Sequence, residues 1–447
     1  MLSRSDAQWN GTLDGAGSMQ RVSRNVAPHL HPPARATEVH RAIQSAKVDK
    51  MLARPFLFAL QGHSDGIYTL TRSRKSVAFA ATGSADGEVR LWHLPSQSCK
   101  WSKIVEPASF VRGVAFTSKT NRLLACTDAA QVYSFSLDDD EPTDESSTKM
   151  YTSSSGPLQS ISACYDEHKF ATASSVIKIW DESRSEAIQS FTWGIDTLHH
   201  VCYNPVETTI LASCASDRSI AFYDTRLSSP VRKLVLRMRS NTISWNPIEA
   251  YHFTVASDDH NLYTYDMRRL GRRGALVTHK GHVGPVMAVD YSPTGREFCT
   301  GSYDSTIRIF PHTERNSREV YHTKRMQKVF GVNFSGDGAY VISGSDDGDV
   351  RVWKSERSRP VGPLLKREKQ KIAESEKLID RYAALEDVRN INRKRHLPRM
   401  VLHHTKEKKV MEQSRKRKER NIRKHTRRER RPKRIPESLK NIVKEIE

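Results

Sequence analysis

GSADGEVRLW (residues 83–92) and GSDDGDVRVW (residues 344–353) are two copies of one ten-residue pattern. Each copy ends on a tryptophan and carries an aspartate six residues earlier, Asp86 before Trp92 and Asp347 before Trp353. Aromatic residues recur from the first copy to the second at intervals of 42 to 45 residues. They are Trp92, Phe135, Trp180, Tyr223, Tyr265, Phe310 and Trp353. So regular a period predicts one four-stranded unit repeated around a ring.

The residues around these aromatics have the pattern of half-buried strands. VRLW, IKIW and IRIF alternate between apolar and polar side chains, and a Gly-His pair opens two of the units, at Gly62-His63 and Gly281-His282. On these residues the chain resembles the WD-repeat β-propeller family. The resemblance implies an all-β fold, a seven-bladed propeller over residues 51–354. The apolar run 56–60 is then expected to supply the outer strand of the last blade and to close the ring.

The same resemblance implies a buried hydrogen-bonded network of His, Ser or Thr, Asp and Trp within each blade. In the sixth unit Phe310 replaces the tryptophan, and in the second and third units Ala129 and Ser174 replace the aspartate. Packing alone is expected to hold the second and third blades. The implied network residues are His63, Ser84, Asp86, Trp92, His282, Ser302, Asp304, Asp347 and Trp353.

Histidine, aspartate and serine together could also form a catalytic set. Their repetition around a ring favours an architectural role, because an active site is usually single and buried polar groups must be paired. The chain has no phosphate-binding glycine loop, no GxSxG and no HExxH, and its six cysteines include no CxxC pair. We therefore predict no enzyme activity, no catalytic residue, no cofactor and no metal site. Single cysteines favour a reducing, intracellular compartment.

The charge of the chain is concentrated at one end. Residues 355–447 contain 31 Lys and Arg against 14 Asp and Glu, a net charge of +17, whereas the whole chain carries +21. Such an asymmetry indicates a polyanionic partner for the basic end. No apolar signal segment begins the chain and no run of about 18 apolar residues occurs, so neither secretion nor a membrane span is expected.

The basic end is predicted to be a helical tail, residues 355–447, with one long helix from Pro398 to about Thr426. Its charge would attract RNA, since arginine-rich segments commonly become ordered on RNA. A nuclear localisation signal is the alternative, and both uses can coexist. A membrane-surface helix is disfavoured because the opposite face lacks large apolar residues. The predicted RNA-binding residues are Arg415, Lys416, Arg417, Lys418, Arg420, Arg423, Lys424, Arg427, Arg428, Arg430 and Arg431.

Three further segments lie outside the repeat pattern. Residues 1–50 are predicted to be an extended N-terminal arm. The acidic, Ser-rich stretch 138–157 is expected to be a disordered loop, whose role stays open. Near the C-terminus, Leu439, Ile442, Val443 and Ile446 follow helical spacing and predict a short amphipathic helix that docks on protein.

Several stretches, including REVYHTKRMQ (318–327) and RKRHLPRMV (393–401), resemble the suppressor-of-fibrillarin family, a nucleolar group of WD-repeat proteins. The resemblance covers roughly residues 19–430. It implies a non-catalytic scaffold in small ribosomal subunit biogenesis, located in the nucleolus. The implied partners are pre-ribosomal RNA, the box C/D small nucleolar ribonucleoprotein and other proteins of the small-subunit processome, but no membrane.

A second function is implied by the ends of two consecutive repeats. Tyr223-Asp224-Thr225-Arg226 and Tyr265-Asp266-Met267-Arg268 resemble the W/YDxR motif of WD-repeat receptors that bind the adaptor of cullin-RING ubiquitin ligases. There Arg226 and Arg268 would present guanidinium groups to acceptors on the adaptor. An arginine in this position can instead pack against its own aspartate. The alternative function is thus a substrate receptor of a cullin-RING ligase.

Overall fold

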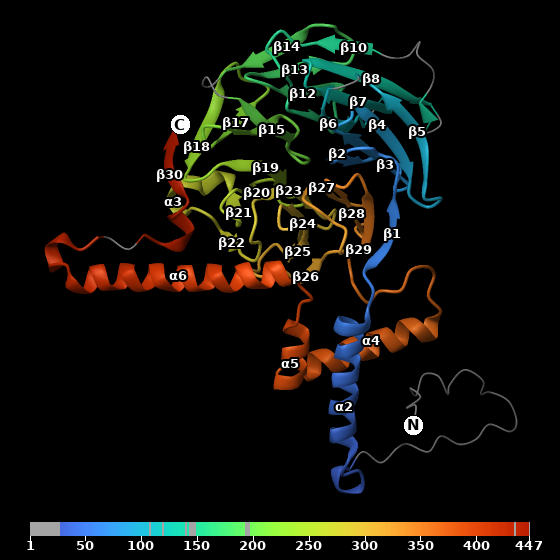
Figure 1. Ribbon diagram of the computed structural model, residues 1–447, viewed down its shortest axis with the longest axis vertical. Helices are drawn as coiled ribbons and strands as arrows, with labels where there is room; N and C mark the ends of the chain where they lie inside the picture. Colours follow the sequence, from blue (N-terminus) through green and yellow to red (C-terminus); the bar gives the residue numbers. More distant parts are fainter. Residues whose placement is uncertain are drawn as a thin grey trace, which may run out of the picture. The chain divides into compact units, whose positions relative to one another are not determined.

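The computed structural model describes residues 27–106, 109–118, 120–138, 141–142, 149–192, 197–432 and 435–446. Seven antiparallel sheets follow one another along the described chain and are arranged in a ring (Figure 1). The innermost strands of neighbouring sheets pack on one another, and β2 of the first sheet packs on β27 of the last. The predicted all-β, seven-bladed propeller is therefore confirmed.

Blades 1 to 4 are built from consecutive strands, the first innermost. Blade 1 contains β2 (Ile67–Arg72), β3 (Phe79–Ser84), β4 (Glu88–His93) and β5 (Ser98–Ile104). Blade 2 contains β6 (Val111–Phe116), β7 (Arg122–Thr127), β8 (Gln131–Asp138) and β10 (Lys149–Thr152), and β9 (Glu141–Pro142) pairs with β8. Blade 3 contains β11 (Ser160–Ala163), β12 (Lys169–Ala173), β13 (Ile177–Asp181) and β14 (Ala187–Phe191). Blade 4 contains β15 (Leu198–Tyr203), β16 (Ile210–Ala215), β17 (Ser219–Asp224) and β18 (Pro230–Leu236).

Blades 5 and 6 repeat this order. Blade 5 contains β19 (Ser240–Trp245), β20 (His252–Ser257), β21 (Leu262–Asp266) and β22 (Val277–His279), with two short helical turns, η5 (Met267–Arg269) and α3 (Leu270–Arg273), before its last strand. Blade 6 contains β23 (Val286–Tyr291), β24 (Glu297–Ser302), β25 (Ile307–Pro311) and β26 (Glu319–Tyr321).

Blade 7 combines the two ends of the repeat region. Its inner strands are β27 (Val329–Phe334), β28 (Tyr340–Ser345) and β29 (Val350–Lys354), and its outer strand is β1 (Phe56–Leu60). β1 pairs antiparallel with β29, so that Phe56 faces Trp353 and Leu60 faces Val350. The predicted closing strand is confirmed.

The seven periodic aromatics all occupy the blade cores. Each is 3% exposed or less, and Phe56 packs edge-on against Trp353 with ring centroids 5.4 Å apart. Burial of such large side chains is the main stabilising contribution of each blade, because each removes a large apolar area from water.

The aspartate of the pattern stabilises the turn between the strand before it and the strand after it. Asp86, Asp217, Asp259 and Asp304 each accept a hydrogen bond from the backbone N–H two residues on, at 2.9–3.0 Å. The residue after the aspartate lies in the left-handed region in several blades, which explains Gly87 (φ 82°) and Gly348 (φ 78°). The Asp-Gly of the pattern is thus a turn requirement.

A buried network joins His63 to Trp92, with one member different from the expected one. Nε2 of His63 lies 2.7 Å from Oγ1 of Thr82, and Trp92 donates to the same oxygen at 2.8 Å. Ser84, the expected member, donates instead to the carbonyl oxygen of Asp65. Thr82 lies two residues earlier on β3, on the same face of the strand. Trp92 pairs with Ala80, so Thr82 is nearer to the tryptophan than Ser84 is.

Blade 6 differs from the predicted network in the same way. His282 contacts Thr300 at 2.8 Å, whereas Ser302 donates to the carbonyl oxygens of Gly284 and Pro285. His282 also lies 2.9 Å from Asp304. In blade 1 the carboxylate of Asp86 accepts from the N–H and the hydroxyl of Ser64.

Blade 7 has its own variant of the network. Trp353 donates to Ser343 at 3.0 Å, while Asp347 accepts from Arg351 and Ser345. In blade 3, where the aspartate is missing, Trp180 still donates to Thr172 at 2.9 Å. The expectation that packing alone holds this blade was therefore wrong.

Residues outside the repeats form parts of two compact units rather than an arm and a single tail. The described residues of Met1–Leu52 and Pro360–Lys394 make one unit, and the rest of the C-terminal segment belongs with the propeller. The small unit contains the 3-10 turn η2 (Pro28–Leu30), α2 (Ala34–Lys47), the π-helical turn η3 (Val48–Leu52), α4 (Lys366–Arg381) and α5 (Glu386–Arg393).

The core of this small unit is made by both chain segments. Ala42 and Ala46 of α2 are fully buried against Val388 and Ile391 of α5, and Tyr382 donates to Glu38 at 2.8 Å. The prediction of an extended arm was wrong for residues 34–47, because the two alanines let α2 approach the other helices closely and the apolar residues after 370 supply the missing core.

The propeller unit includes α6 (Arg399–His425), the 3-10 turns η6 (Arg428–Arg430) and η7 (Glu437–Leu439), and β30 (Ile442–Ile446). β30 pairs antiparallel with β18 and adds a fifth strand to blade 4. A short amphipathic helix was expected here. The edge of β18 offers unpaired backbone groups that a strand can satisfy along its whole length, which favours the extended conformation.

Part of the acidic stretch 138–157 lies outside the described residues, namely 139–140 and 143–148. Residues 149–152 form β10, the outer strand of blade 2. In the turn that follows, Ser153 N–H donates to the carbonyl oxygen of Ala130, and Ser155 and Ser174 hydroxyls lie 2.8 Å apart. The described residues 149–157 thus belong to the blades and not to a disordered loop.

Shortening Leu60 to alanine tests the closure of the ring. Leu60 is 2% exposed, so Leu60→Ala leaves a cavity at the joint and should lower the free energy of unfolding by about 2–5 kcal/mol in denaturant titrations. Ile104→Ala, in the outer strand of blade 1 and 62% exposed, serves as the control and should change stability much less. Equal effects of the two substitutions would contradict a closing role for β1.

Acid should destabilise the propeller through its buried histidines. Burial lowers the pKa of His63, His200 and His279 from 6.5 to about 4. Between these values the unfolded chain binds more protons than the folded one, so stability falls as the pH drops from 6.5 to 4, by up to about 3 kcal/mol per histidine. His279→Gln should flatten this pH dependence in unfolding titrations, whereas His403→Gln, on an exposed side chain, should leave it unchanged.

Candidate interaction sites

The His–Asp pairs of the blades offer no catalytic geometry. His282 is 1% exposed and both of its ring nitrogens are engaged, Nδ1 with Asp304 and Nε2 with Thr300. A general base must reach a substrate proton, and this ring cannot. Candidate functional residues therefore lie on exposed segments, first on α6 and then at the ends of β17 and β21.

The basic helix α6 consists of two parts with different surroundings. Near its start Val401 is 4% exposed, and Lys408 donates to the carbonyl oxygen of His282 in blade 6 at 3.1 Å. Just before the helix, Arg395 donates to the carbonyl oxygen of Ser317. These contacts attach the first turns of α6 to the propeller.

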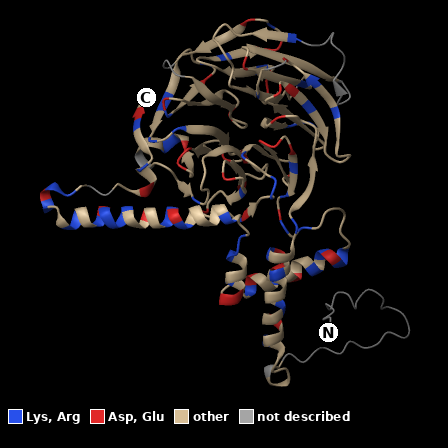
Figure 2. Cartoon of the chain, viewed as in Figure 1, with Lys and Arg blue, Asp and Glu red and all other residues tan. Residues whose placement is uncertain are grey.

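The second part of α6 is cationic on every side. Figure 2 shows the basic residues crowded along this helix. Arg415, Lys416, Arg417 and Lys418 are consecutive and all exposed, and successive residues of an α-helix point about 100° apart. No face of this turn can therefore pack on the chain itself without burying a charge. The other predicted RNA-binding residues of the helix, Arg420, Arg423 and Lys424, are exposed as well.

Among the described residues, few acidic side chains neutralise this charge. Glu419 lies 3.5 Å from Arg415 and 3.9 Å from Lys440. The basic residues of the last turn, Arg423, Lys424 and His425, interact favourably with the helix dipole, which stabilises the helix end. Beyond the helix, Arg427, Arg428, Arg430 and Arg431 are also exposed. The segment is thus a preformed helix with a strongly positive surface.

Arg226 and Arg268 occupy matching positions at the same end of the ring, because β17 and β21 are the third strands of adjacent blades and run in the same direction. Arg226 forms a forked pair with Asp224, with Nε and Nη2 within 3.1 Å of its carboxylate, and its side chain is 71% exposed. Arg268 makes the same fork with Asp266 at 3.2 Å and is 56% exposed.

Both arginines are therefore held in place and still accessible. The guanidinium of Arg268 also stacks over Tyr251, 4.3 Å from the ring centroid. The pairing with aspartate raises the pKa of both arginines and fixes the plane of each fork, while the outward N–H groups face away from the pair. Each arginine therefore pairs with its own aspartate, as the alternative interpretation expected, and its side chain is still exposed to solvent.

Two features could not be read from the sequence, because they depend on contacts between segments that are distant in the chain. β30 was predicted as a helix, because Ile442, Val443 and Ile446 fit helical spacing as well as strand pairing. Glu249, His252 and His312 come together from blades 5 and 6, and their ligand atoms lie within 4.8 Å of one another. The Glu-x-x-His spacing was visible, but nothing in the sequence pointed to the third residue.

Two family models match the chain. The model "WD domain, G-beta repeat" matches residues 54–93, 274–310 and 318–354, and the model "Sof1-like domain" matches residues 355–442. The second match covers α4, α5, α6 and η7, so that it includes parts of both compact units.

Several relatives are similar over nearly the whole chain. "DDB1- and CUL4-associated factor 13" of Danio rerio is 42% identical over 443 residues, which cover 96% of each protein. The protein of the same name from Homo sapiens is 39% identical over 408 residues, 91% of each. "Protein SOF1" of Saccharomyces cerevisiae is 38% identical over 404 residues, 85% of this chain and 82% of the yeast protein.

Proposed function

The chain belongs to the Sof1 family of WD-repeat proteins, and from this premise we propose that it is a non-catalytic scaffold in small ribosomal subunit biogenesis. Its partners are pre-ribosomal RNA, the box C/D small nucleolar ribonucleoprotein and other proteins of the small-subunit processome. The observation that carries the proposal is the distal half of α6, whose consecutive cations point to all sides.

The chemistry of α6 favours contacts with the nucleic-acid backbone. The ten residues from Arg415 to Lys424 extend over about 15 Å, and their charges would displace the counterions of several phosphates. The helix contains no Phe, Tyr or Trp, so it offers no aromatic side chain on which a base could stack. We infer that α6 binds RNA by charge and shape, without reading its sequence.

The propeller supplies the rigid part of this scaffold. In its blades the buried side chains of His63, Thr82, Trp92 and His282 are used in the hydrogen-bonded networks. We also propose that the same basic residues serve as a nuclear localisation signal and that the protein acts in the nucleolus with its RNA partner. Among the helices described, none is long and apolar enough to cross a membrane.

A second function, as substrate receptor of a cullin-RING ubiquitin ligase, is favoured by the two forked arginines. The animal relatives are called DDB1- and CUL4-associated factors. Arg226 and Arg268 lie at one end of the ring in adjacent blades, each oriented by an aspartate two residues earlier. Oriented guanidinium groups lose little side-chain entropy when they bind acceptors on a partner. The scaffold function remains the main proposal. The ring and α6 can serve the scaffold function and the ligase function together.

Neutralising the distal half of α6 tests the RNA proposal. The variant Arg415→Gln, Lys416→Gln, Arg417→Gln and Lys418→Gln keeps good helix formers but removes four charges. It should bind pre-ribosomal RNA fragments more weakly, and the slope of log affinity against log salt should fall by about 3 if each cation contacts a phosphate of single-stranded RNA. Filter-binding titrations at several salt concentrations measure both quantities.

The matched control removes four charges from the exposed basic helix α4, by glutamine substitution of Lys366, Arg367, Lys369 and Lys371. This control changes the net charge by the same amount as the α6 variant. If the position of the removed charges matters, it should lower the affinity for RNA only slightly. Equal losses for both variants would indicate a general charge effect and contradict a specific role of α6.

The ligase proposal is tested by Arg226→Ala combined with Arg268→Ala. The double variant should lose co-purification with the cullin-RING adaptor while its RNA binding stays at the wild-type level. Arg184→Ala, an exposed arginine just beyond β13 at the same end of the ring, is the control and should keep the adaptor. An adaptor that never co-purifies with the wild-type protein would refute this function.

A further inference from the structure

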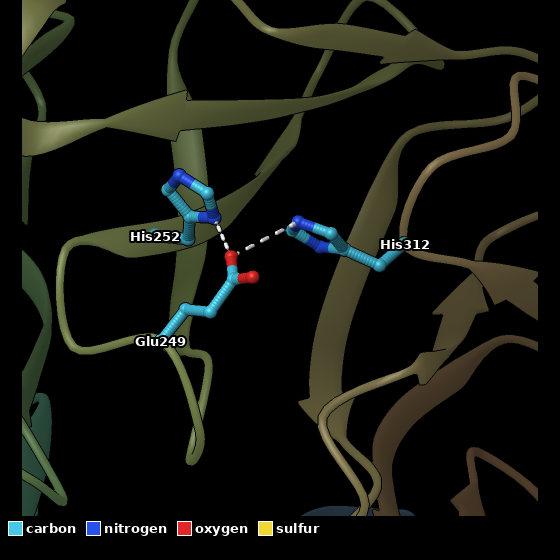
Figure 3. A group of neighbouring side chains, drawn as sticks. All are labelled: Glu249, His252 and His312. Atoms are coloured by element: carbon cyan, nitrogen blue, oxygen red, sulfur yellow. Dashed lines mark ion pairs between the residues drawn. The ribbon is translucent and has the colours of Figure 1, made fainter.

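A group of metal-ligating side chains lies between blades 5 and 6, away from α6. Glu249 precedes β20, His252 is the first residue of β20, and His312 directly follows β25 (Figure 3). Nδ1 of His252 pairs with a carboxylate oxygen of Glu249, and Nε2 of His312 lies 3.9 Å from the same oxygen. The two imidazole rings are stacked with centroids 5.4 Å apart.

The other ring nitrogen of each histidine faces a polar group, and that of His312 is within hydrogen-bond distance of it. Nδ1 of His312 lies 3.0 Å from the hydroxyl of Tyr291, which in turn lies 2.6 Å from the hydroxyl of Thr254. Nε2 of His252 lies 4.0 Å from a carboxylate oxygen of Asp266, which is 8% exposed. The Tyr291 hydroxyl thus orients the His312 ring, while the Asp266 carboxylate lies behind the His252 ring, beyond hydrogen-bond distance. Metal-binding histidines show this arrangement, with the far nitrogen held by a carboxylate or hydroxyl.

We propose that Glu249, His252 and His312 form a zinc site that joins blades 5 and 6. Two imidazole nitrogens and one carboxylate oxygen are a common zinc ligand set, with a fourth position left for water or a partner. Tetrahedral ligands about 2.05 Å from zinc lie roughly 3.3 Å apart, so small rotations of Glu249, 54% exposed, and of His312 bring the atoms into place. Calcium and magnesium prefer sets made of oxygen alone.

The inference does not rest on the proposed function. Its location has a structural consequence, because the Asp266 carboxylate behind His252 also holds Arg268. Zinc would thus fix the aspartate that orients one of the two forked arginines.

The test uses the full chain, treated with a chelator and then titrated with zinc in competition with a chromophoric chelator. The wild-type protein should bind one zinc ion that is lost, or weakened by about tenfold or more, in Glu249→Gln and in His312→Ala. Zinc should also raise the thermal unfolding midpoint of the wild type and not that of Glu249→Gln. Glu249 is exposed, so this variant will fold even if His312→Ala does not.

The control addresses the second exposed group of possible ligands, His403, His404 and Glu407 on α6. His403→Ala should bind zinc as the wild type does. Two results would overturn the proposal. One is equal zinc affinity in the wild type and Glu249→Gln, and the other is loss of zinc binding in His403→Ala with full binding in Glu249→Gln.

Discussion

The antiparallel pairing of β1 with β29 is the constraint on which the rest of the structure depends. Without it, blade 7 would have only three strands, and no strand would fasten the two ends of the repeat region together. The pairing places Phe56 opposite Trp353, and the backbone N–H of Lys354 donates to the carbonyl oxygen of Pro55. The chain therefore enters and leaves the propeller at one place. This explains why a helix before residue 53 and helices after residue 359 can share one small core.

The net charge differs between the ring and the helix α6, because the two parts bury different side chains. The ring buries its seven periodic aromatic side chains, and residues 1–354 carry only +4 of the net charge of +21. In α6 the first turns contribute Val401 and Lys408 to contacts with the propeller, whereas Arg415 to Lys418 cannot be buried on any side. One helix is thereby attached at its start and exposed as a cationic surface at its end. The proposed scaffold function follows from this division between a rigid ring and an exposed basic helix.

The sequence predicted the features that depend on short-range patterns. The aromatic period predicted seven blades, the run 56–60 predicted the closing strand, and the uninterrupted stretch after Pro398 predicted a helix close to the observed Arg399–His425. The blade network was predicted two residues away from its true member, since Thr82 and Thr300 are used in place of Ser84 and Ser302. Serine and threonine on the same strand face look alike in sequence, and in blade 1 only the register with the neighbouring strand that carries Trp92 distinguishes them.

The sequence by itself determined the repeat, the closure and the basic end, because each is encoded by neighbouring residues with a fixed period or composition. Tertiary structure alone decided that residues 34–47 fold with α4 and α5, that Ile442–Ile446 extends blade 4 as a strand, and that His312 meets Glu249 and His252. In each case the partner is distant in the chain, and the local sequence fits more than one conformation. Burial of apolar area and satisfaction of backbone hydrogen bonds by that partner select the one that forms.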